Sequence, residues 1–212
     1  MPINFSNGDT LSNAPSGTEN KVRAFGSNTQ YTPSSGTKSI RVYCVAGGGG
    51  GGDATGDDSG EQSDFGASSG GGGGGAAIGF YTIGSNFTAS IQIGGGGSGN
   101  NNGGESKFHN LSGQYSGNGN LDATGGQRGN GNSNFGGNGS GATGGFSLTG
   151  MKGNNRSTSS SAGQYHQVPG NGGLAAYVFG VFGRGGHGSG PTGSFSEGGS
   201  GEAGIVVVYE FL

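Results

Sequence analysis

Uninterrupted glycine runs constrain this chain more than any other feature of its sequence. Glycine fills 58 of the 212 positions, about four times its usual share, and forms solid runs at 47–52, 70–75 and 94–97. Ordering each residue costs about 1–2 kcal/mol of backbone entropy, and hydrophobic residues, at 27%, are too few for an ordinary core. We therefore expect backbone hydrogen bonds, each contributing about 1 kcal/mol net, to hold the glycine runs together.

Two arrangements of the glycine runs satisfy this expectation. Glycine can adopt a left-handed threefold helix like polyproline II, rising about 3.1 Å per residue. Because glycine keeps its N–H, such helices can hydrogen-bond to several neighbours and form a close lattice. The alternative is a set of glycine-rich β-sheets with bulges and loops. We favour the lattice, since runs of six glycines weaken strands. Only 5 prolines occur, which excludes a collagen helix.

Apolar, strand-forming residues predict strands at both ends of the glycine region. In residues 39–46, Ile40, Val42 and Cys44 share one face. The segment 205–211, Ile-Val-Val-Val-Tyr-Glu-Phe, is the most strongly strand-forming stretch, and we expect it to pair with 39–46. Further short strands are predicted at 3–5, 21–25, 78–83, 88–93 and 174–182. No segment of ten residues has helical periodicity, so the predicted fold class is all-β and irregular, without substantial α-helix.

The sequence divides into a short leading segment and a glycine-rich domain. Residues 1–38 have ordinary composition with turn signals, and we expect them to form an N-terminal attachment segment. Residues 39–212 are predicted to form the glycine-rich domain. It carries insertions of varied side chains at 53–69, 109–135 and 151–169, which suit recognition loops on a rigid scaffold.

Charge and hydropathy exclude several classes of partner. The net charge is −3, and the nine Lys and Arg residues are scattered, so no basic stripe for nucleic acid is present. No stretch approaches 18 apolar residues, so no membrane insertion is expected. The N-terminal residues lack a basic region followed by an apolar run, which predicts synthesis in the cytoplasm without a signal peptide. The single Cys44 excludes an internal disulfide.

Four pieces of the chain, in order, resemble the glycine-rich domains of bacteriophage tail fibre and distal adhesin proteins. They are YTPSSGTKSIRVYCVAGGGGGG at 31–52, SIQIGGGGSG at 90–99, GESKFHNL at 104–111 and GEAGIVVVYEF at 201–211. The resemblance implies packed polyglycine helices whose loops recognise a bacterial outer-membrane protein or surface glycan. It also implies a distal place in the virion, with the N-terminal segment held by another phage tail protein.

These expectations combine into one leading function and one alternative. The leading prediction is a virion protein at a tail fibre or tail tip that binds a host-surface receptor through loops on a rigid glycine-rich scaffold. The alternative is a purely structural virion component, such as a tail-tip, collar or capsid decoration protein. A homo-oligomer is compatible with both, and neither needs a cofactor.

Motifs that could carry chemistry are weak here. Residues 66–70 match G-x-S-x-G, but a nucleophile elbow needs a strand before it and a helix after it. An acidic stretch precedes this match and a glycine run follows, so no catalytic residue and no enzymatic activity are predicted.

Metal ligands are likewise sparse in the sequence. Asp53, Asp57 and Asp58, followed by Glu61 and Asp64, form the one acidic cluster. Their oxygens could hold Ca²⁺, yet the D-x-D-x-D-G pattern is missing, so a solvated loop is the favoured interpretation. His109, His166 and His187 are too far apart in sequence to predict a zinc site.

Aromatic residues divide into predicted core and predicted contact groups. Several lie on strand-like pieces and are predicted to pack in the core or cap a sheet: Tyr43, Phe80, Tyr81, Tyr177, Phe179, Phe182 and Tyr209. Others lie in polar, turn-rich stretches, where aromatic rings among Asn, Ser and Arg are typical of recognition surfaces. The candidate receptor-binding residues are Tyr115, Phe135, Arg156, Tyr165 and His166. The alternative for these rings is that they fold back over the lattice.

Overall fold

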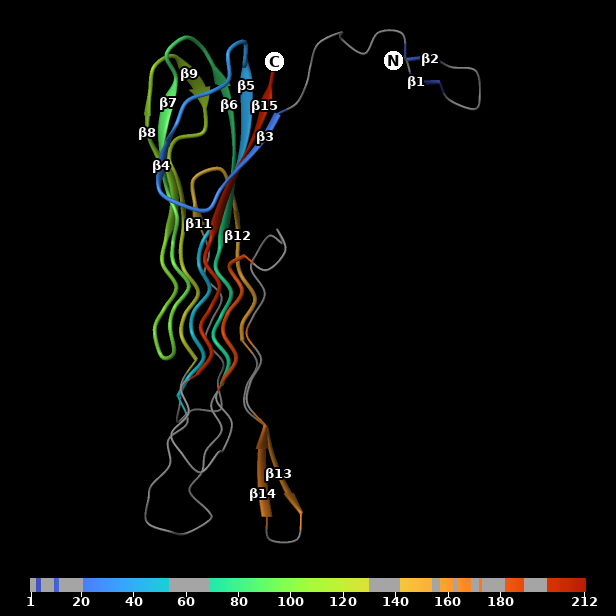
Figure 1. Cartoon of the computed structure of the whole chain (residues 1–212), viewed down its shortest axis with the longest axis vertical. Coiled ribbons are helices and arrows are strands. Elements are labelled where there is room, and N and C mark those ends of the chain that lie inside the picture. The colour runs from blue at the N-terminus through green and yellow to red at the C-terminus, as the bar shows by residue number, and fades with distance from the viewer. Residues whose placement is uncertain are drawn as a thin grey trace.

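Two antiparallel β-sheets and a glycine-rich extension make up an elongated all-β molecule (Figure 1). This computed structural model describes residues 21–53, 69–129, 142–153, 172, 182–188 and 198–212. It also describes the backbone of short strands at 3–4, 10–11, 157–161 and 164–168. No helix occurs in the part of the chain that the structure describes, as the sequence predicts.

The larger sheet has the strand order β12-β6-β5-β15-β3, and β9 pairs with β6 beyond this path. Its strands are β3 (Lys21–Phe25), β5 (Ser39–Val45), β6 (Ala76–Ile83), β9 (Tyr115–Gly117), β12 (Phe146–Leu148) and β15 (Ile205–Phe211). The predicted pairing of the two strongest strands is confirmed, because β15 lies antiparallel to β5 with Val207 opposite Tyr43. β15 is not an edge strand, since β3 pairs along its other side.

The second sheet has the order β11-β10-β8-β7-β4. Its strands are β4 (Thr29–Tyr31), β7 (Thr88–Gln92), β8 (Ser106–Ser112), β10 (Leu121–Ala123) and β11 (Ala142–Thr143). Two separate hairpins, β1 (Ile3–Asn4) with β2 (Thr10–Leu11) and β13 (Ser157–Ser161) with β14 (Gln164–Val168), complete the strands.

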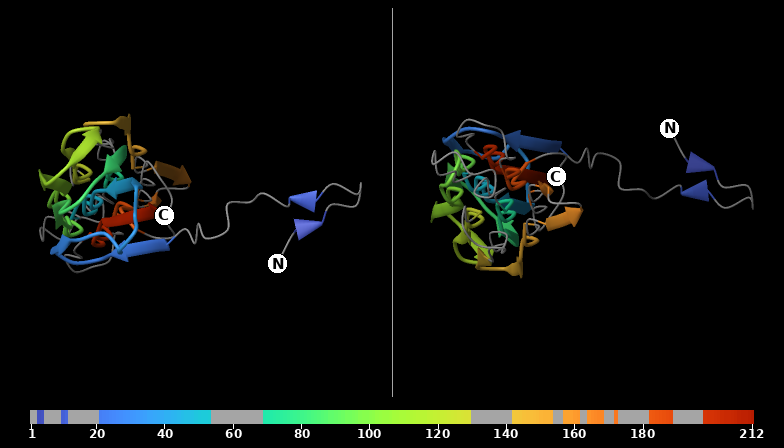
Figure 2. Two further views of the ribbon diagram at one scale, coloured as in Figure 1. Left: turned by 90° about the horizontal axis from the view of Figure 1, so that it is seen from above. Right: turned by 90° about the horizontal axis from the view of Figure 1, so that it is seen from below.

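The chain passes between the sheets several times, two of these passages run along the sheet edges, and the sheets do not close into a barrel. β3 runs on into β4 at one side, and β11 runs on into β12 at the other. The second passage turns at Gly144 and Gly145, whose φ angles of 78° and 57° lie in the left-handed region that glycine adopts at no steric cost. Figure 2 views this sheet pair along the long axis of the molecule.

A side-chain core lies between the two sheets. Ile40, Val42 and Cys44 of β5 are buried against Phe108 of β8 and Leu121 of β10. The expectation that apolar residues are too few for an ordinary core is therefore wrong for this half of the molecule. The apolar residues are concentrated here, whereas the glycines are concentrated beyond the strand ends.

Residues 21–38, predicted as part of the attachment segment, contribute two strands to these sheets. β3 pairs with β15 and β4 pairs with β7. Both partner strands come from the region predicted as the glycine-rich domain. Whether residues 1–38 attach the chain to another protein stays a prediction.

Glycine-rich segments continue the sheet strands and pack together as a bundle below them (Figure 1). We call this the glycine bundle, and its described segments are 46–53, 69–75, 94–105, 124–129, 149–153, 182–188 and 198–204. The central segment, 46–52, donates backbone hydrogen bonds to three different neighbours in turn, and the pattern repeats every three residues. The donor–acceptor pairs are Ala46–Gly75, Gly47–Gly104, Gly48–Glu202, Gly49–Gly72, Gly50–Asn101, Gly51–Gly199 and Gly52–Ser69, at 2.8–3.1 Å.

The carbonyls of the same central segment accept hydrogen bonds from two further segments, 124–129 and 182–188, and from residues 97–100 of the segment 94–105. Gly126 and Gly129 donate to residues three apart in the central run, and Gly97 and Asn100 do the same from another segment. Gly186 donates from the third. The central segment is thus surrounded by backbone on all sides. An added Cβ at Gly49 would collide with the carbonyl oxygen of Gln127, so only glycine fits there.

Two other expectations from the sequence are corrected by the structure. Residues 109–129, predicted as part of a recognition insertion, instead form strands β8 to β10 and a segment of the glycine bundle. Phe80, predicted as core or capping, is 47% exposed because it lies on the outer side of β6. The strand predicted at 174–182 lies outside the described residues except for Phe182.

Candidate functional site

The far end of the glycine bundle, away from the sheets, is where the insertion at 53–69 begins and ends. We call this end the tip, formed by residues 52–53, 69, 129, 153, 188 and 198. Gly52 donates to the Ser69 carbonyl at 3.0 Å, and Gly129 donates to Gly50 at 2.8 Å. The two ends of the insertion at 53–69 are therefore neighbours at this end of the bundle. The ends of β3 and β15 that hold Lys21 and Phe211 lie at the opposite end of the molecule (Figure 1).

Asp53 is a structural residue of the tip. Its Oδ1 accepts a hydrogen bond from the Gly198 backbone N–H at 3.0 Å, which joins the start of the insertion at 53–69 to the bundle segment 198–204. Asp57 and Asp58, the other members of the weak metal candidate, lie outside the described residues. Among the residues that the structure describes, no three His, Cys, Asp or Glu side chains cluster in a way that could hold a metal ion.

The predicted receptor-binding residues fall at different ends of the molecule. Tyr165 and His166 are neighbours on β14, where they pair with Ser160 and Ser159 of β13. That hairpin lies at the tip end of the molecule in Figure 1. Phe135 and Arg156 lie outside the described residues.

Tyr115 lies far from that hairpin. It belongs to β9 and packs edge to face against Phe87, with ring centroids 5.7 Å apart, while 43% of its surface stays exposed. Figure 1 shows β9 at the sheet end, opposite β13 and β14. Tyr115 and the Tyr165–His166 pair therefore cannot contact one receptor site together.

A polar turn beside the tip was missed by reasoning from the sequence. Asn100 adopts a φ of 63°, and the Arg128 guanidinium donates to both its carbonyl and its side-chain oxygen at 3.1 and 3.0 Å. Asn102 accepts from the Arg128 backbone N–H at 2.9 Å. The signal available in the sequence was Asn100–Asn101–Asn102 within glycine-rich surroundings, which favours turns. These exposed groups add amide and guanidinium donors next to the tip.

A pocket of about 440 Å³ opens on the side of the glycine bundle. Arg184, His187, Ser200 and Glu202 line it, together with backbone from Gly172, Gly185 and Gly186. These side chains are exposed, while backbone groups of the same segments form hydrogen bonds within the bundle. The Glu202 N–H donates to the Arg184 carbonyl at 2.8 Å. The lining side chains supply a cation (Arg184), an anion (Glu202) and a hydroxyl group (Ser200), which suit a polar ligand.

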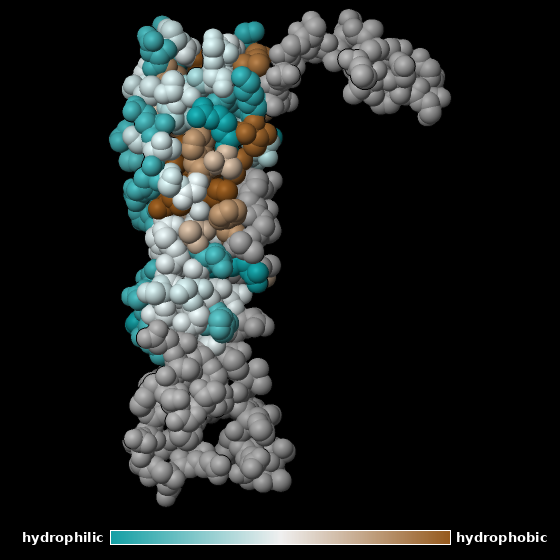
Figure 3. All heavy atoms as spheres, viewed as in Figure 1, coloured by the Kyte–Doolittle hydropathy of each residue, from teal (hydrophilic) through white to brown (hydrophobic). Residues whose placement is uncertain are grey.

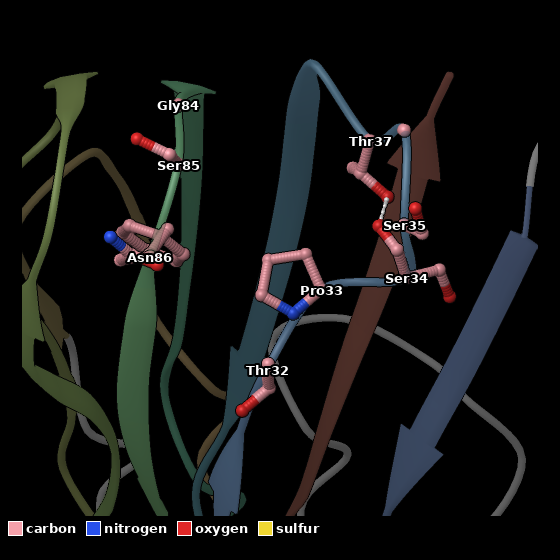
Figure 4. Close-up of a pocket in the computed structure, with 10 residues that line it drawn as sticks. Thr32, Pro33, Ser34, Ser35, Thr37, Gly84, Ser85 and Asn86 are labelled. Atoms are coloured by element: carbon pink, nitrogen blue, oxygen red, sulfur yellow. Dashed lines mark hydrogen bonds between the residues drawn. The ribbon is translucent and has the colours of Figure 1, made fainter.

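A second pocket, of about 490 Å³, lies at the sheet end between the β4–β5 and β6–β7 connections (Figure 4). Hydroxyl groups and Pro33 line it, and the Thr37 hydroxyl donates to the Ser34 carbonyl at 2.8 Å. No charged side chain lines this pocket.

Glu210 is a fully buried carboxylate on the inner face of β15. It accepts from the Tyr31 hydroxyl at 2.8 Å and from Arg23 at 3.2 Å, and the Ser34 N–H lies 3.4 Å from both of its oxygens. Burial would raise the pKa of Glu210, but the hydrogen bonds from Ser34, Tyr31 and Arg23 outweigh it and lower the pKa. Burial and the bond to Glu210 raise the pKa of Tyr31. The group stays charged and holds β3, β4 and β15 together.

The described residues do not form a catalytic site around the G-x-S-x-G match. Gly66, Ala67 and Ser68 lie outside them, while Ser69 is buried and its carbonyl accepts from Gly52. His109 on β8 and His187 in the glycine bundle are held on different elements. In the described part of the chain, no helix is long and apolar enough to cross a membrane.

Two comparisons with known proteins, one by family model and one by sequence, found no match. No protein-family model matches this sequence, and no curated protein matches it at a significant level.

Proposed function

We propose that this chain is a bacteriophage virion protein at a tail fibre or tail tip, which binds a host-surface receptor through the insertions at its tip. The glycine bundle is, in this proposal, a set of packed polyglycine II helices that serves as a rigid scaffold. The single observation that carries the proposal is that the insertion at 53–69 leaves and rejoins the bundle at the end opposite the described chain ends, where the β13–β14 hairpin also lies.

The hydrogen bonds of residues 46–52 support the assignment of polyglycine II helices. A β-strand bonds to neighbours on two sides only, because its backbone N–H and C=O groups point to two opposite sides in the plane of the sheet. A threefold helix directs successive N–H groups 120° apart, so every third residue meets the same neighbour. The central segment follows the second pattern, with Gly49 and Gly52 bonding to the same segment as Ala46.

The position of the insertions supports the receptor-binding role. A bundle held by backbone bonds from many directions gives little freedom to its ends, and loops on such a scaffold tolerate sequence change. Their composition supports contact with proteins or glycans, since aromatic and amide groups such as those of Tyr165, His166 and Asn100 suit adaptable recognition. The sheet end would then face the virion, where the N-terminal segment joins another tail protein.

Adsorption competition tests this function. Purified protein is added to host cells before the phage, and the rate of phage adsorption is measured. We expect adsorption to fall as the protein concentration rises. Unchanged adsorption at saturating protein would refute receptor binding and leave the structural virion role.

Alanine variants locate the binding surface in the same assay. Tyr165→Ala, His166→Ala and Arg156→Ala should each weaken competition by roughly 5- to 30-fold, as expected for central contacts worth about 1–2 kcal/mol. Tyr115→Ala at the sheet end is the matched aromatic control. A loss confined to Tyr115→Ala would place the receptor contact at the sheet end and contradict the role of the tip.

A further inference from the structure

The six-stranded sheet carries apolar side chains on its outer face as well as on its inner one. Strand register sets a row across this outer face, in which Val22 lies opposite Tyr209, Tyr209 opposite Arg41, and Arg41 opposite Phe80. Phe146 of β12 lies one row further, opposite Ile78. The sheet therefore has a second apolar surface that the core between the sheets does not use.

Part of this outer face is open to solvent. Val22 is 55% exposed, Phe80 47% and Phe146 67%. Phe80 and Phe146 stack edge to face with centroids 6.3 Å apart. Figure 3 shows hydrophobic residues gathering over the sheet half of the molecule, while the visible part of the glycine bundle is pale or hydrophilic. Exposed apolar side chains gathered on one face of a sheet mark a candidate interaction surface.

Arg41 lies within this patch, and none of the described residues gives it a carboxylate partner. Its guanidinium carbon lies 4.9 Å from the Tyr209 ring centroid and 5.3 Å from that of Tyr43. Its Nε is buried and donates no hydrogen bond, and no ion pair joins Arg41 to a carboxylate among the described residues. By contrast, Arg23 on β3 is paired with Glu210. The Arg41 guanidinium therefore has no counter-ion among the described residues, and a carboxylate supplied from outside would stabilise its charge.

We propose that this patch, formed by Val22, Arg41, Phe80 and Phe146, docks a neighbouring virion protein that presents a carboxylate flanked by apolar side chains. The carboxylate would pair with Arg41, and the apolar groups would cover the two phenylalanines. Aromatic residues and arginine are the residue types that dominate binding energy at interfaces. The identity of the partner rests on the proposed function.

Charge argues against a second copy of this chain as the occupant. A two-fold dimer uses the same patch on both partners, which would bring one unpaired Arg41 towards another. Like charges facing each other across an interface cost several kcal/mol. The patch also lies on the sheet half, away from the tip and on the same sheet as Lys21, where residues 1–20 join the fold. This is the end that the proposed function assigns to the virion.

Photo-crosslinking in phage particles tests the docking surface. A p-benzoylphenylalanine is placed at Phe80, and at His109 on the outer face of the other sheet as the control. Particles are purified and irradiated, and the crosslinked peptides are identified by mass spectrometry. We expect a crosslink from position 80 to a different virion protein, within a peptide that holds Asp or Glu beside apolar residues, and none from position 109.

Charge variants then test the role of Arg41. Arg41→Glu should weaken the crosslink at least tenfold, and replacing the partner's carboxylate by Lys should restore it. Phe146→Ser, at an exposed site, serves as a second variant if Arg41→Glu does not fold, and should also weaken the crosslink. A crosslink to this chain itself, no crosslink in particles that contain the chain, or one unchanged by both variants would overturn the inference alone. Absence of the chain from purified particles would refute the proposed function, and the inference with it.

Discussion

The glycine bundle predicts opposite outcomes for the same substitution at two glycines. A Cβ at Gly49 would collide with the Gln127 carbonyl oxygen, whereas a Cβ at Gly95 would meet nothing within 4 Å. Relief of the first collision must separate two segments. That movement strains three hydrogen bonds of 2.8–2.9 Å, which are Gly49 to Gly72, Gly72 to Gln127 and Gly186 to Gly49. At about 1–2 kcal/mol for each buried bond lost, Gly49→Ala should destabilise the fold by roughly 3–6 kcal/mol.

Gly95→Ala should instead be neutral or stabilising by about 0.4–1 kcal/mol, because alanine reduces the freedom of the unfolded chain. Thermal unfolding followed by calorimetry measures both. A chain of this size shifts by about 2–4 °C per kcal/mol, so Gly49→Ala should melt roughly 6–24 °C below wild type and Gly95→Ala at or slightly above it. A Gly49→Ala variant that melts within 2 °C of wild type would refute the close packing of the bundle, as would equal losses at both sites.

Three further predictions concern the sheet half. Val42→Asp and Val207→Asp, at buried positions on opposite faces of the larger sheet, should each abolish soluble folding because an unpaired buried charge costs several kcal/mol; recovery of folded protein in both, by circular dichroism, would contradict this. Since the pKa of Glu210 is lowered in the fold, its stabilising contribution is present above its ordinary pKa of about 4.3 and is lost as pH falls through the lower, folded value. Glu210→Gln should therefore flatten the acid side of the stability profile, and an unchanged profile would count against the network. Burial raises the pKa of the Cys44 thiol to about 12, so a thiol reagent at pH 8 should modify Cys44 only after unfolding; rapid labelling of native protein would be the opposing result.

The strands of the core could be predicted because their side chains alternate. Ile40, Val42 and Cys44 mark one face of β5, and the valines of β15 mark its partner. The short strands could not be predicted in this way. Residues 115–117, Tyr-Ser-Gly, become a strand because they pair with the free side of β6, and nothing in their own composition favours one.

The hydrogen-bond pattern of the glycine bundle also could not be predicted from the sequence. Its period of three belongs to the backbone, and neighbours such as Asn101 and Glu202 contribute carbonyls that any residue would carry. A glycine run shows no side-chain period that could be counted. The sequence could therefore indicate backbone packing from composition, but it could not say which segments surround residues 46–52.

The candidate site was only partly accessible for a related reason. Tyr115 and Tyr165 look alike in sequence, since both lie among polar, turn-forming residues. Strand pairing separates them, because β9 joins the larger sheet while β14 pairs only with β13. The docking patch was hidden because Phe80 and Val22 lie on strand-like pieces that predict burial, and only the layer arrangement decides which face is covered.

Binding of the purified chain to host cells tests the central claim most directly. Residues 54–68 and 154–171 are each replaced by a Gly-Ser segment of equal length, singly and together, and binding of fluorescently labelled protein is measured by flow cytometry beside the melting temperature. The account predicts wild-type melting for all variants, loss of binding in the combined variant, and loss in at least one single variant. Full binding by the combined variant, with its melting temperature unchanged, would contradict the claim that the tip of the glycine bundle contacts the host.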